Sequence, residues 1–591
     1  MHYYSFRATG ITSLPVELLA RIFVLGAGFD FPYASSPFLL KPDQDYYAIP
    51  SSNLQLLVSQ VCHHWRQIAL STSSLWNILH LSAPEHLPRA QEYLTRCTRS
   101  TQLLDIIVDT VAEPEYLQGG NLFRTELQEI FEIIIPHVRR WRSFHLKVRD
   151  HDCKALARRY LSTCGPAPSL QTLQLYHFED YRTVQNLYLA TYRPPVIVFN
   201  NDLPSLRNVS LIGVNLPWAD SPYLVHLHNL ELALHPANIR PPYEYWESML
   251  RNSPDLQTLS LHYSGPRVAN GDTTLGWPVA KERVYIHSLE NLSLTDLDPG
   301  YLCLLMGRLF LPNLRRLSLD LPHQDFTSFV ELIGGHKLWV SDEIPTTSAS
   351  SAASSPSYSN TLSPSTSFTA RSLTSTTAIS AAPVTVSPFP IPAKIETLIL
   401  TALECSMGSA RAMLRSLEGL CFLEVHFSRV SDGLYGVLME GAGESVPDGE
   451  NYISAHSRSK MECLDPPTSS WCSHHACTTP LLPRLQTFKI SGLSGAKVKR
   501  LIEYRESQRT PCCARGERSL NREYKVERWI VAWSFRRRGM DVVLDRLVEL
   551  GWRNSSGQMV TVETFDDEGD EDEEEDDEGN EGDTSEEETD Q

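Results

Sequence analysis

Apolar residues recur along most of the chain in one short pattern, Φ-x-x-Φ-x-Φ, where Φ is apolar and x is any residue. Ten occurrences that recur along the chain lie between Trp141 and Ile490. The alternation at its end is typical of a short strand whose apolar side chains point to one face of a sheet. The ten occurrences start at Trp141, Leu170, Leu206, Leu227, Leu256, Leu289, Leu314, Ile395, Leu420 and Leu485.

The spacing of this pattern predicts a repeat protein. Successive occurrences start 21 to 36 residues apart, except for two longer intervals of 81 and 65 residues. Short intervals of this size are close to the period of leucine-rich repeats, in which each strand adds one layer to a solenoid core. The positions between the apolar ones then face the concave surface. We therefore predict an α/β fold, with an irregular leucine-rich-repeat-like solenoid over residues 100–553.

The two long intervals coincide with segments of loop composition. Ser341 to Pro392 is rich in Ser, Thr, Ala and Pro, and removing its 52 residues leaves a normal interval of 29. Residues 428–482 are rich in Gly, Ser and Pro. Such composition cannot bury enough apolar surface to order itself, so both segments are predicted to be loops that interrupt the solenoid.

Residues 11–81 show helical periodicity instead. Ser13 can cap a helix whose first turn contains Pro15, where a missing N–H costs little. A loop rich in Pro, Gly, Ser, Tyr and Phe is predicted over residues 26–52. A second helix is predicted from Leu54 to Leu70, followed by a last short turn that carries Leu75, Trp76, Ile78 and Leu79. The apolar positions at helical spacing are Leu14, Leu18, Ile22 and Phe23 in the first helix. In the second they are Leu54, Leu57, Val58, Val61, Trp65, Ile68 and Ala69, which are predicted to form one buried stripe.

This helical block resembles the F-box. The resemblance rests on "LPVELLARIF", on "LVSQVCHHWRQIAL" and on the closing "LW" at Leu75 and Trp76, about 45 residues in all. The chain departs from the usual pattern in the loop of about 27 residues between the first two helices. F-box modules dock on the Skp-type adaptor of cullin–RING ubiquitin ligases, so the resemblance implies such an adaptor and the cullin ligase core as partners.

The resemblance also implies which residues would serve adaptor binding, some by direct contact and some through packing. They are Leu14, Pro15, Leu18, Ile22, Val58, Val61, Trp65 and Trp76.

The run Cys62-His63-His64 looks like a metal or catalytic centre but is better explained by a helix. Consecutive helical side chains diverge by about 100°, so these three cannot converge on one ion. Cys62 flanks the predicted apolar stripe, and His63 and His64 lean toward the polar side.

Other candidate chemistry is weak. Cys463, Cys472 and Cys477, with His474 and His475 between, lack the paired spacing of zinc modules, as does Cys512-Cys513 downstream. The run from Gly492 to Lys497 lacks the spacing of a phosphate-binding loop and is predicted to be a turn between repeat and helix. We therefore predict no catalytic residues, no metal site and no cofactor, and a protein that is not an enzyme.

Charge is concentrated at the C-terminus. Of the 71 acidic residues, 19 lie between Glu563 and Asp590, and the remaining 52 equal the 52 Lys and Arg. Residues 563–591 are predicted to be a disordered acidic tail. It follows a segment, Lys497 to Arg553, with 15 basic and 8 acidic residues. The tail either screens that segment or only keeps the protein soluble.

The balanced body shows no basic stripe, so nucleic acid is not an expected partner, and Arg536-Arg537-Arg538 is too short to change this. No window resembles a membrane span or a secretory signal, so no membrane partner is expected. The twelve scattered cysteines are expected to be mostly reduced, in the cytoplasm, the nucleus or both. Two functions remain: a non-catalytic substrate receptor of an SCF-type ubiquitin ligase that binds an unknown protein substrate, or a repeat scaffold without a ligase role.

Overall fold

The computed structural model describes the chain in sixteen stretches, and every structural statement below refers to them. They are residues 11, 14–29, 36–41, 54–97, 102–110, 122–148, 151–177, 195–268, 277, 283–335, 394–431, 433–439, 481–507, 526, 528–534 and 560–565.

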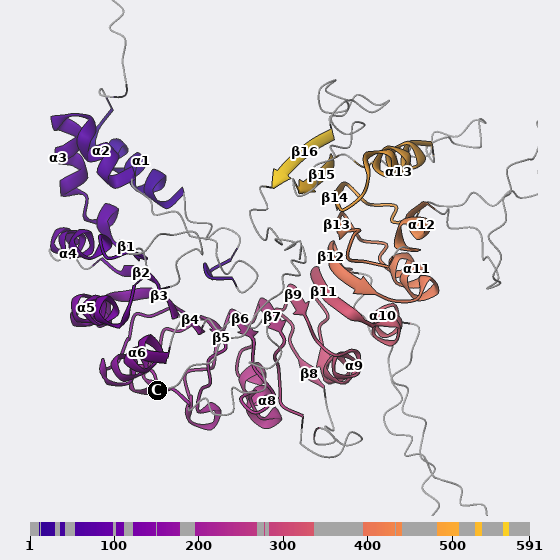
Figure 1. Cartoon of the computed structure of the whole chain (residues 1–591), viewed down its shortest axis with the longest axis horizontal. Helices are drawn as coiled ribbons and strands as arrows, with labels where there is room; N and C mark the ends of the chain where they lie inside the picture. Colours follow the sequence, from indigo (N-terminus) through magenta and orange to yellow (C-terminus); the bar gives the residue numbers. More distant parts are fainter. Residues whose placement is uncertain are drawn as a thin grey trace, which may run out of the picture.

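Parallel strands form one continuous curved sheet (Figure 1). Fourteen strands of the described residues follow one another in chain order, each paired with the next, apart from β8 and β10, which form a separate parallel pair. The sheet strands are β1 (Ile78–Leu81), β2 (Leu104–Asp109), β3 (Trp141–Val148), β4 (Thr172–His177), β5 (Asn208–Ile212), β6 (Asn229–Ala233), β7 (Thr258–His262), β9 (Asn291–Thr295), β11 (Arg316–Asp325), β12 (Thr397–Glu404), β13 (Phe422–His426), β14 (Thr487–Ser491), β15 (Arg528–Ser534) and β16 (Val560–Phe565). The separate pair is β8 (Val284–Tyr285) and β10 (Leu309–Phe310).

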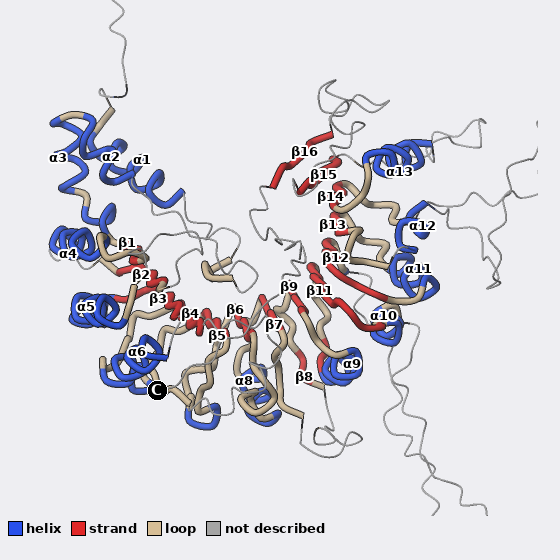
Figure 2. The backbone as a smooth tube through the Cα atoms, in the orientation of Figure 1, coloured by secondary structure: helices blue, strands red, loops and turns tan. Residues whose placement is uncertain are grey.

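Helices cover the convex side of this sheet, so that the fold is a strand–helix solenoid with the strands lining the inside of an arc (Figure 2). The chain also forms short 3₁₀ turns. One, η3 (Ser73–Trp76), precedes the first strand, and the others lie between strands: η4 (Ile135–Arg140), η5 (Phe199–Asn201) and η6 (Trp218–Asp220). The convex helices are α4 (His86–Cys97), α5 (Arg124–Ile134), α6 (His151–Thr163), α8 (Tyr243–Arg251), α9 (Pro299–Arg308), α10 (Thr327–Ile333), α11 (Met407–Ser416), α12 (Gly433–Met439) and α13 (Gly495–Ser507).

Each of the ten occurrences of the apolar pattern ends on a strand of the sheet. In each, the last two apolar residues are in register with their neighbours, as Leu173 with Val209 and Val209 with Leu230. These side chains are buried between sheet and helices and belong to one hydrophobic core that extends from Leu19 to Val531. The predicted α/β solenoid is therefore present. Its repeats stack because each strand–helix unit leaves apolar side chains uncovered on the side where the next unit packs.

The sheet extends beyond the predicted limits of the solenoid. Ile78 and Leu79, expected in a last helical turn, begin strand β1, which pairs with β2. At the other end β16 includes residues 563–565, the start of the predicted acidic tail. The prediction from the ten occurrences missed four strands of the sheet. Three of them carry the complete motif, as Trp76-Leu79-Leu81 at β1, Leu103-Ile106-Val108 at β2 and Val526-Trp529-Val531 at β15, whereas β16 has Gly557 in place of the leading apolar residue.

Three helices stand at the N-terminal end of the arc: α1 (Val16–Phe29), α2 (Leu54–Val61) and α3 (His63–Ser71). The single helix predicted from Leu54 to Leu70 is wrong, because the chain breaks at Cys62. This residue is extended (φ −158°, ψ 169°), and its Sγ accepts a hydrogen bond from Trp65 N at 3.4 Å, which caps α3. Helix α1 also continues to Phe29, into the predicted loop.

The predicted loops lie mostly outside the described residues. Residues 336–393 and 440–480 are not described, nor are the tail beyond 565 and the cysteine–histidine groups near 470 and 512. Of residues 30–53, only 36–41 are described, and this short stretch lies on the concave side of the sheet. Among the described helices, none has the length and apolar character needed to cross a membrane.

Candidate docking surfaces

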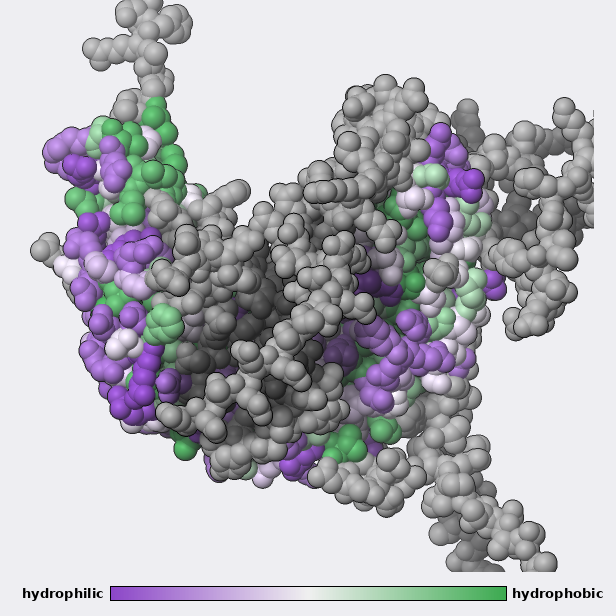
Figure 3. Space-filling view, viewed as in Figure 1, coloured by the Kyte–Doolittle hydropathy of each residue, from purple (hydrophilic) through white to green (hydrophobic). Residues whose placement is uncertain are grey.

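Exposed apolar side chains gather on the N-terminal helices. Of the fourteen large apolar side chains that are exposed in the described residues, eight lie between Ile11 and Leu70. Figure 3 shows the corresponding hydrophobic area over this end of the molecule. Helix spacing places three of them on one face of α1 and two on one face of α2. We call these five the helical apolar surface: Leu18, Ile22, Leu25, Leu57 and Val61.

The opposite face of α1 is buried against the neighbouring helices. Leu19, Phe23 and Ala27 are buried, and the Phe23 ring lies 4.9 Å from that of Trp65 in α3. Helix α1 therefore has one apolar face that packs against α2 and α3 and a second that faces solvent. A contiguous exposed apolar patch is unfavourable in a monomer and is typical of a surface that docks on another protein.

The predicted adaptor residues divide into exposed and buried groups. Leu18 (52% exposed), Ile22 (44%) and Val61 (60%) belong to the helical apolar surface, and Pro15 is exposed at the start of α1. Leu14 and Trp65 are half-buried against the core. The prediction that Leu57 and Val61 belong to a buried stripe is wrong. Because the chain breaks at Cys62, the buried residues of α2 and α3 do not form one continuous stripe.

Val58 and Trp76 are buried and can act only through packing. Trp76 Nε1 donates to the carbonyl of Ala69 at 2.8 Å. Its ring meets the edge of Tyr93 at 4.9 Å and lies 4.1 Å from the Arg96 guanidinium. Trp76 therefore joins the N-terminal helices to α4, the first helix of the solenoid.

The run at Cys62 takes part in local structure. Cys62 caps α3, and the side chains of His63 and His64 are exposed. Within the described residues no group of three or more His, Cys, Asp or Glu side chains could hold a metal ion. Gly492 follows β14 with φ +72°, and α13 begins at Gly495, so the predicted turn between repeat and helix is confirmed.

The concave face of the sheet is a second candidate surface. Residues between the apolar ones point to this side and form rows across neighbouring strands. In one row the Asn229 amide donates to Asn208 Oδ1 at 2.7 Å, and the Asn208 amide donates to Thr172 Oγ1 at 2.9 Å. Such ladders satisfy the hydrogen-bonding groups of these side chains and give the concave face a regular polar surface.

The next row forms a buried network over β3 to β6. His145 and Gln174 are fully buried, as is Ser210, while Glu231 is 6% exposed. The Gln174 amide donates to Ser210 Oγ at 3.0 Å, and that hydroxyl donates to Glu231 Oε2 at 2.6 Å. Gln174 Oε1 can only accept, so His145 Nδ1, 3.0 Å away, donates to it. Burial lowers the pKa of His145 to about 4, so the ring is neutral.

Further along the arc the concave face is more open. The equivalent positions Ser260 on β7 and Ser293 on β9 are only half-buried. On β13 and β14 Glu424 and Lys489 face each other at 3.4 Å. Both surfaces thus offer contacts for docking. The buried row at Gln174 and Glu231 was missed, because polar residues between leucines give no sign of which are covered.

No protein-family model and no curated protein matches the chain. Among solved structures, the crystal structure of the Rad7 and Elc1 complex in yeast matches at 14% sequence identity and a TM-score of 0.31. The match covers 81% of this chain and 88% of that one.

Proposed function

We propose that this chain is a non-catalytic substrate receptor of an SCF-type ubiquitin ligase. The N-terminal helices bind a Skp-type adaptor and through it the cullin core, and the solenoid holds a protein target. The resemblance of "LPVELLARIF" and "LVSQVCHHWRQIAL" to the F-box supports the choice of adaptor. The function needs no catalytic residues, because tethering a target near the ubiquitin carrier raises its effective concentration.

The observation that carries the proposal is the helical apolar surface. Docking needs large apolar side chains that are free in the isolated chain, and Leu18, Leu57 and Val61 are each more than half exposed. They occupy the same helices that carry the F-box-like sequence. Each such side chain contributes about 1.5–3 kcal/mol when a partner buries it completely.

The first prediction tests this surface. The double variant Leu18→Gln/Val61→Gln removes two exposed apolar contacts without touching the buried side of the helices. We expect it to fold normally and to capture the adaptor at least about tenfold less than wild type, as the loss of one to two such contacts implies. Affinity purification from cells, with quantitation of adaptor and cullin, measures the effect.

A matched control changes exposed apolar residues elsewhere. Ile197 (48% exposed) and Leu304 (37%) lie on the solenoid, and Ile197→Gln/Leu304→Gln should leave adaptor capture unchanged. Wild-type capture by the Leu18/Val61 variant would refute the docking assignment. If wild-type protein recovers no adaptor and no cullin, the chain is instead a repeat scaffold without a ligase role.

A further inference from the structure

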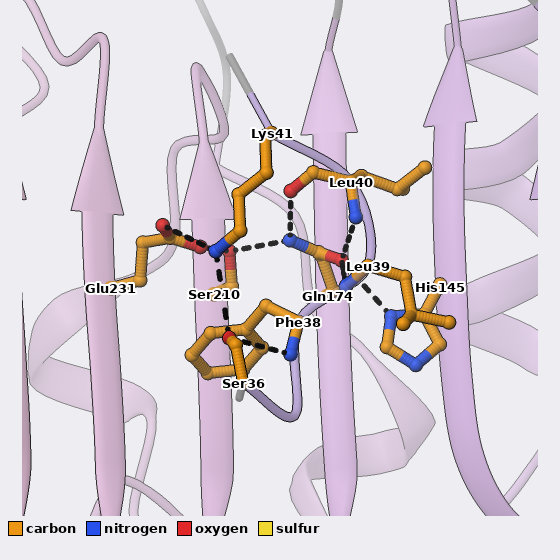
Figure 4. A network of polar contacts seen from close by, with 9 residues as sticks. All are labelled: Ser36, Phe38, Leu39, Leu40, Lys41, His145, Gln174, Ser210 and Glu231. Atoms are coloured by element: carbon orange, nitrogen blue, oxygen red, sulfur yellow. Dashed lines mark hydrogen bonds and ion pairs between the residues drawn. The ribbon is translucent and has the colours of Figure 1, made fainter. Parts of the chain in front are cut away.

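A short segment of the chain, Ser36–Lys41, lies on the concave face as a bound peptide would (Figure 4). The backbone N–H groups of Leu39 and Leu40 donate to Gln174 Oε1 at 3.0 and 2.9 Å. In return Gln174 Nε2 donates to the Leu40 carbonyl at 2.8 Å. One carboxamide thus contacts donors and an acceptor of the peptide main chain, a mode of binding that does not depend on the side chains.

Side chains of the segment add a specific pattern. Leu39 and Leu40 are 8% and 4% exposed. They belong to a small hydrophobic cluster, separate from the main core, with four side chains of the sheet. Those side chains are Ile107, Tyr176, Ile212 and Ala233. Two consecutive apolar residues are therefore the anchors.

The residue after the two apolar anchors, Lys41, carries a positive charge. Lys41 Nζ lies 3.6 Å from Glu231 Oε1, and the Glu231 side chain is only 8% exposed. Lys41 keeps about a third of its own side-chain surface in solvent, at 34%. A carboxylate with so little access to water favours a cationic partner above it. The site thus selects Lys or Arg at the residue after the two apolar anchors.

The sheet side chains that contact the segment are held in place by hydrogen bonds to one another. Gln174 is fixed by His145 on one neighbouring strand and by Ser210 on the other, and Ser210 in turn holds Glu231. All four stand side by side on adjacent paired strands, β3 to β6. A preorganised site of this kind loses little side-chain freedom when a peptide binds.

The segment Ser36–Lys41, by contrast, is not part of the regular structure of the sheet or the helices. It is neither a helix nor a strand of the sheet, and it belongs to the insert between α1, which ends at Phe29, and α2, which begins at Leu54. The contacts between α1, α2 and α3 do not use it. The segment can therefore leave the site while the N-terminal helices keep their packing.

We propose that this part of the concave face is a binding site for an extended peptide of a partner protein, with two large apolar residues followed by Lys or Arg. Ser36–Lys41 occupies the site in the free chain as an intramolecular competitor. The proposal rests on the proposed function in taking that peptide to belong to the ligase target. A tethered competitor acts at an effective concentration in the millimolar range, so a target must outcompete it.

The second prediction tests the site with the chain's own peptide as probe. A fluorescent peptide of residues 35–42, Ser-Ser-Pro-Phe-Leu-Leu-Lys-Pro, is titrated with the full-length protein by fluorescence anisotropy. We expect weak binding to wild type. The variant Leu39→Asp/Leu40→Asp releases the internal segment and should bind the probe at least about tenfold more tightly.

Charge reversal then tests the location. In the released variant, Glu231→Lys should weaken binding of the Lys probe about tenfold and favour a probe with Glu in its place. Glu244→Lys, an exposed change on the convex helix α8, is the matched control and should alter neither. Thermal melting confirms that each variant is folded.

Two results would overturn the proposal: a folded released variant that binds the probe no better than wild type, or equal preference of Glu231→Lys for both probes. Adaptor capture is measured on the same samples. If the wild-type protein captures no adaptor while the released variant still binds the probe, the proposed ligase role is refuted and the peptide-binding site is retained.

Discussion

Two histidines near the start of the solenoid, the buried His80 and the half-buried His86, link stability to pH. Burial, together with repulsion from His86 and Arg89, lowers the pKa of His80 to about 4. Burial and Arg89 lower the pKa of His86 to about 4 as well. Within the folded protein these rings stay neutral in mild acid, whereas the unfolded chain takes up protons near pH 6.5. Their contribution to stability is complete above pH 6.5 and is lost as the pH falls toward 4.

The third prediction follows from this sign. The free energy of unfolding should decrease between pH 6.5 and pH 4 by up to about 1.4 kcal/mol per pH unit for each such histidine. His80→Gln removes one titrating group and should make the decline shallower. Urea unfolding at a series of pH values measures the slope. The same slope in wild type and variant would contradict the assigned pKa of His80.

Each strand–helix unit is stabilised mainly by its neighbours. Leu317 in β11 lies in register with Leu292 of β9 and Leu398 of β12, so a core leucine is covered from both sides. Helix α10 then places Phe329 and Val330 over these strands, both fully buried. The strands β11 and β12 pair directly although residues 336–393 separate them in sequence. An insertion between units is therefore compatible with the stack.

The fourth prediction concerns that insertion. Deleting Thr346 to Pro388 removes no described residue, and loop shortening changes closure entropy only slightly. We expect the melting temperature to change by less than about 3 °C, because every buried contact among the described residues is retained. Circular dichroism or calorimetry measures it.

The comparison is a deletion of Thr327 to Gly335, which removes α10 and its buried side chains. That protein should lose its cooperative transition. A large drop for the loop deletion would mean that the segment carries contacts of its own.

At the scale of the whole molecule, the N-terminal helices and the solenoid share one core. Trp76 packs on Tyr93 and Arg96 of α4, and the thiol of Cys97 donates to the Ser73 carbonyl at 3.3 Å. The core that begins at Leu19 continues through α4 into the first strands without interruption. The helical block is thus not a unit that ends at residue 81.

The fifth prediction tests this boundary. A fragment of residues 1–97 keeps α4 beneath Trp76, whereas residues 1–81 leave the tryptophan ring exposed. The difference corresponds to about 3–5 kcal/mol, the usual effect of losing the packing of a buried aromatic side chain. We expect the longer fragment to unfold at a clearly higher urea concentration, followed by tryptophan fluorescence. Equal midpoints would mean that α4 does not stabilise the helical block.

The apolar spacing by itself determined the solenoid. Leu173, Leu230 and Leu292 predict strands because alternation with period two is a local property of the chain, and recurrence at repeat length requires the strands to stack. The F-box-like segments likewise predicted that the N-terminus is helical.

Only the tertiary structure decided which apolar residues stay exposed and what lies on the concave face. Leu57 and Val61 carry the same helical periodicity as buried residues, and their exposure depends on the break at Cys62. The contact of Leu39 and Leu40 with Gln174 joins residues about 135 positions apart. Such a contact leaves no period in the sequence, because it is made by folding the insert back onto strands that the chain forms much later.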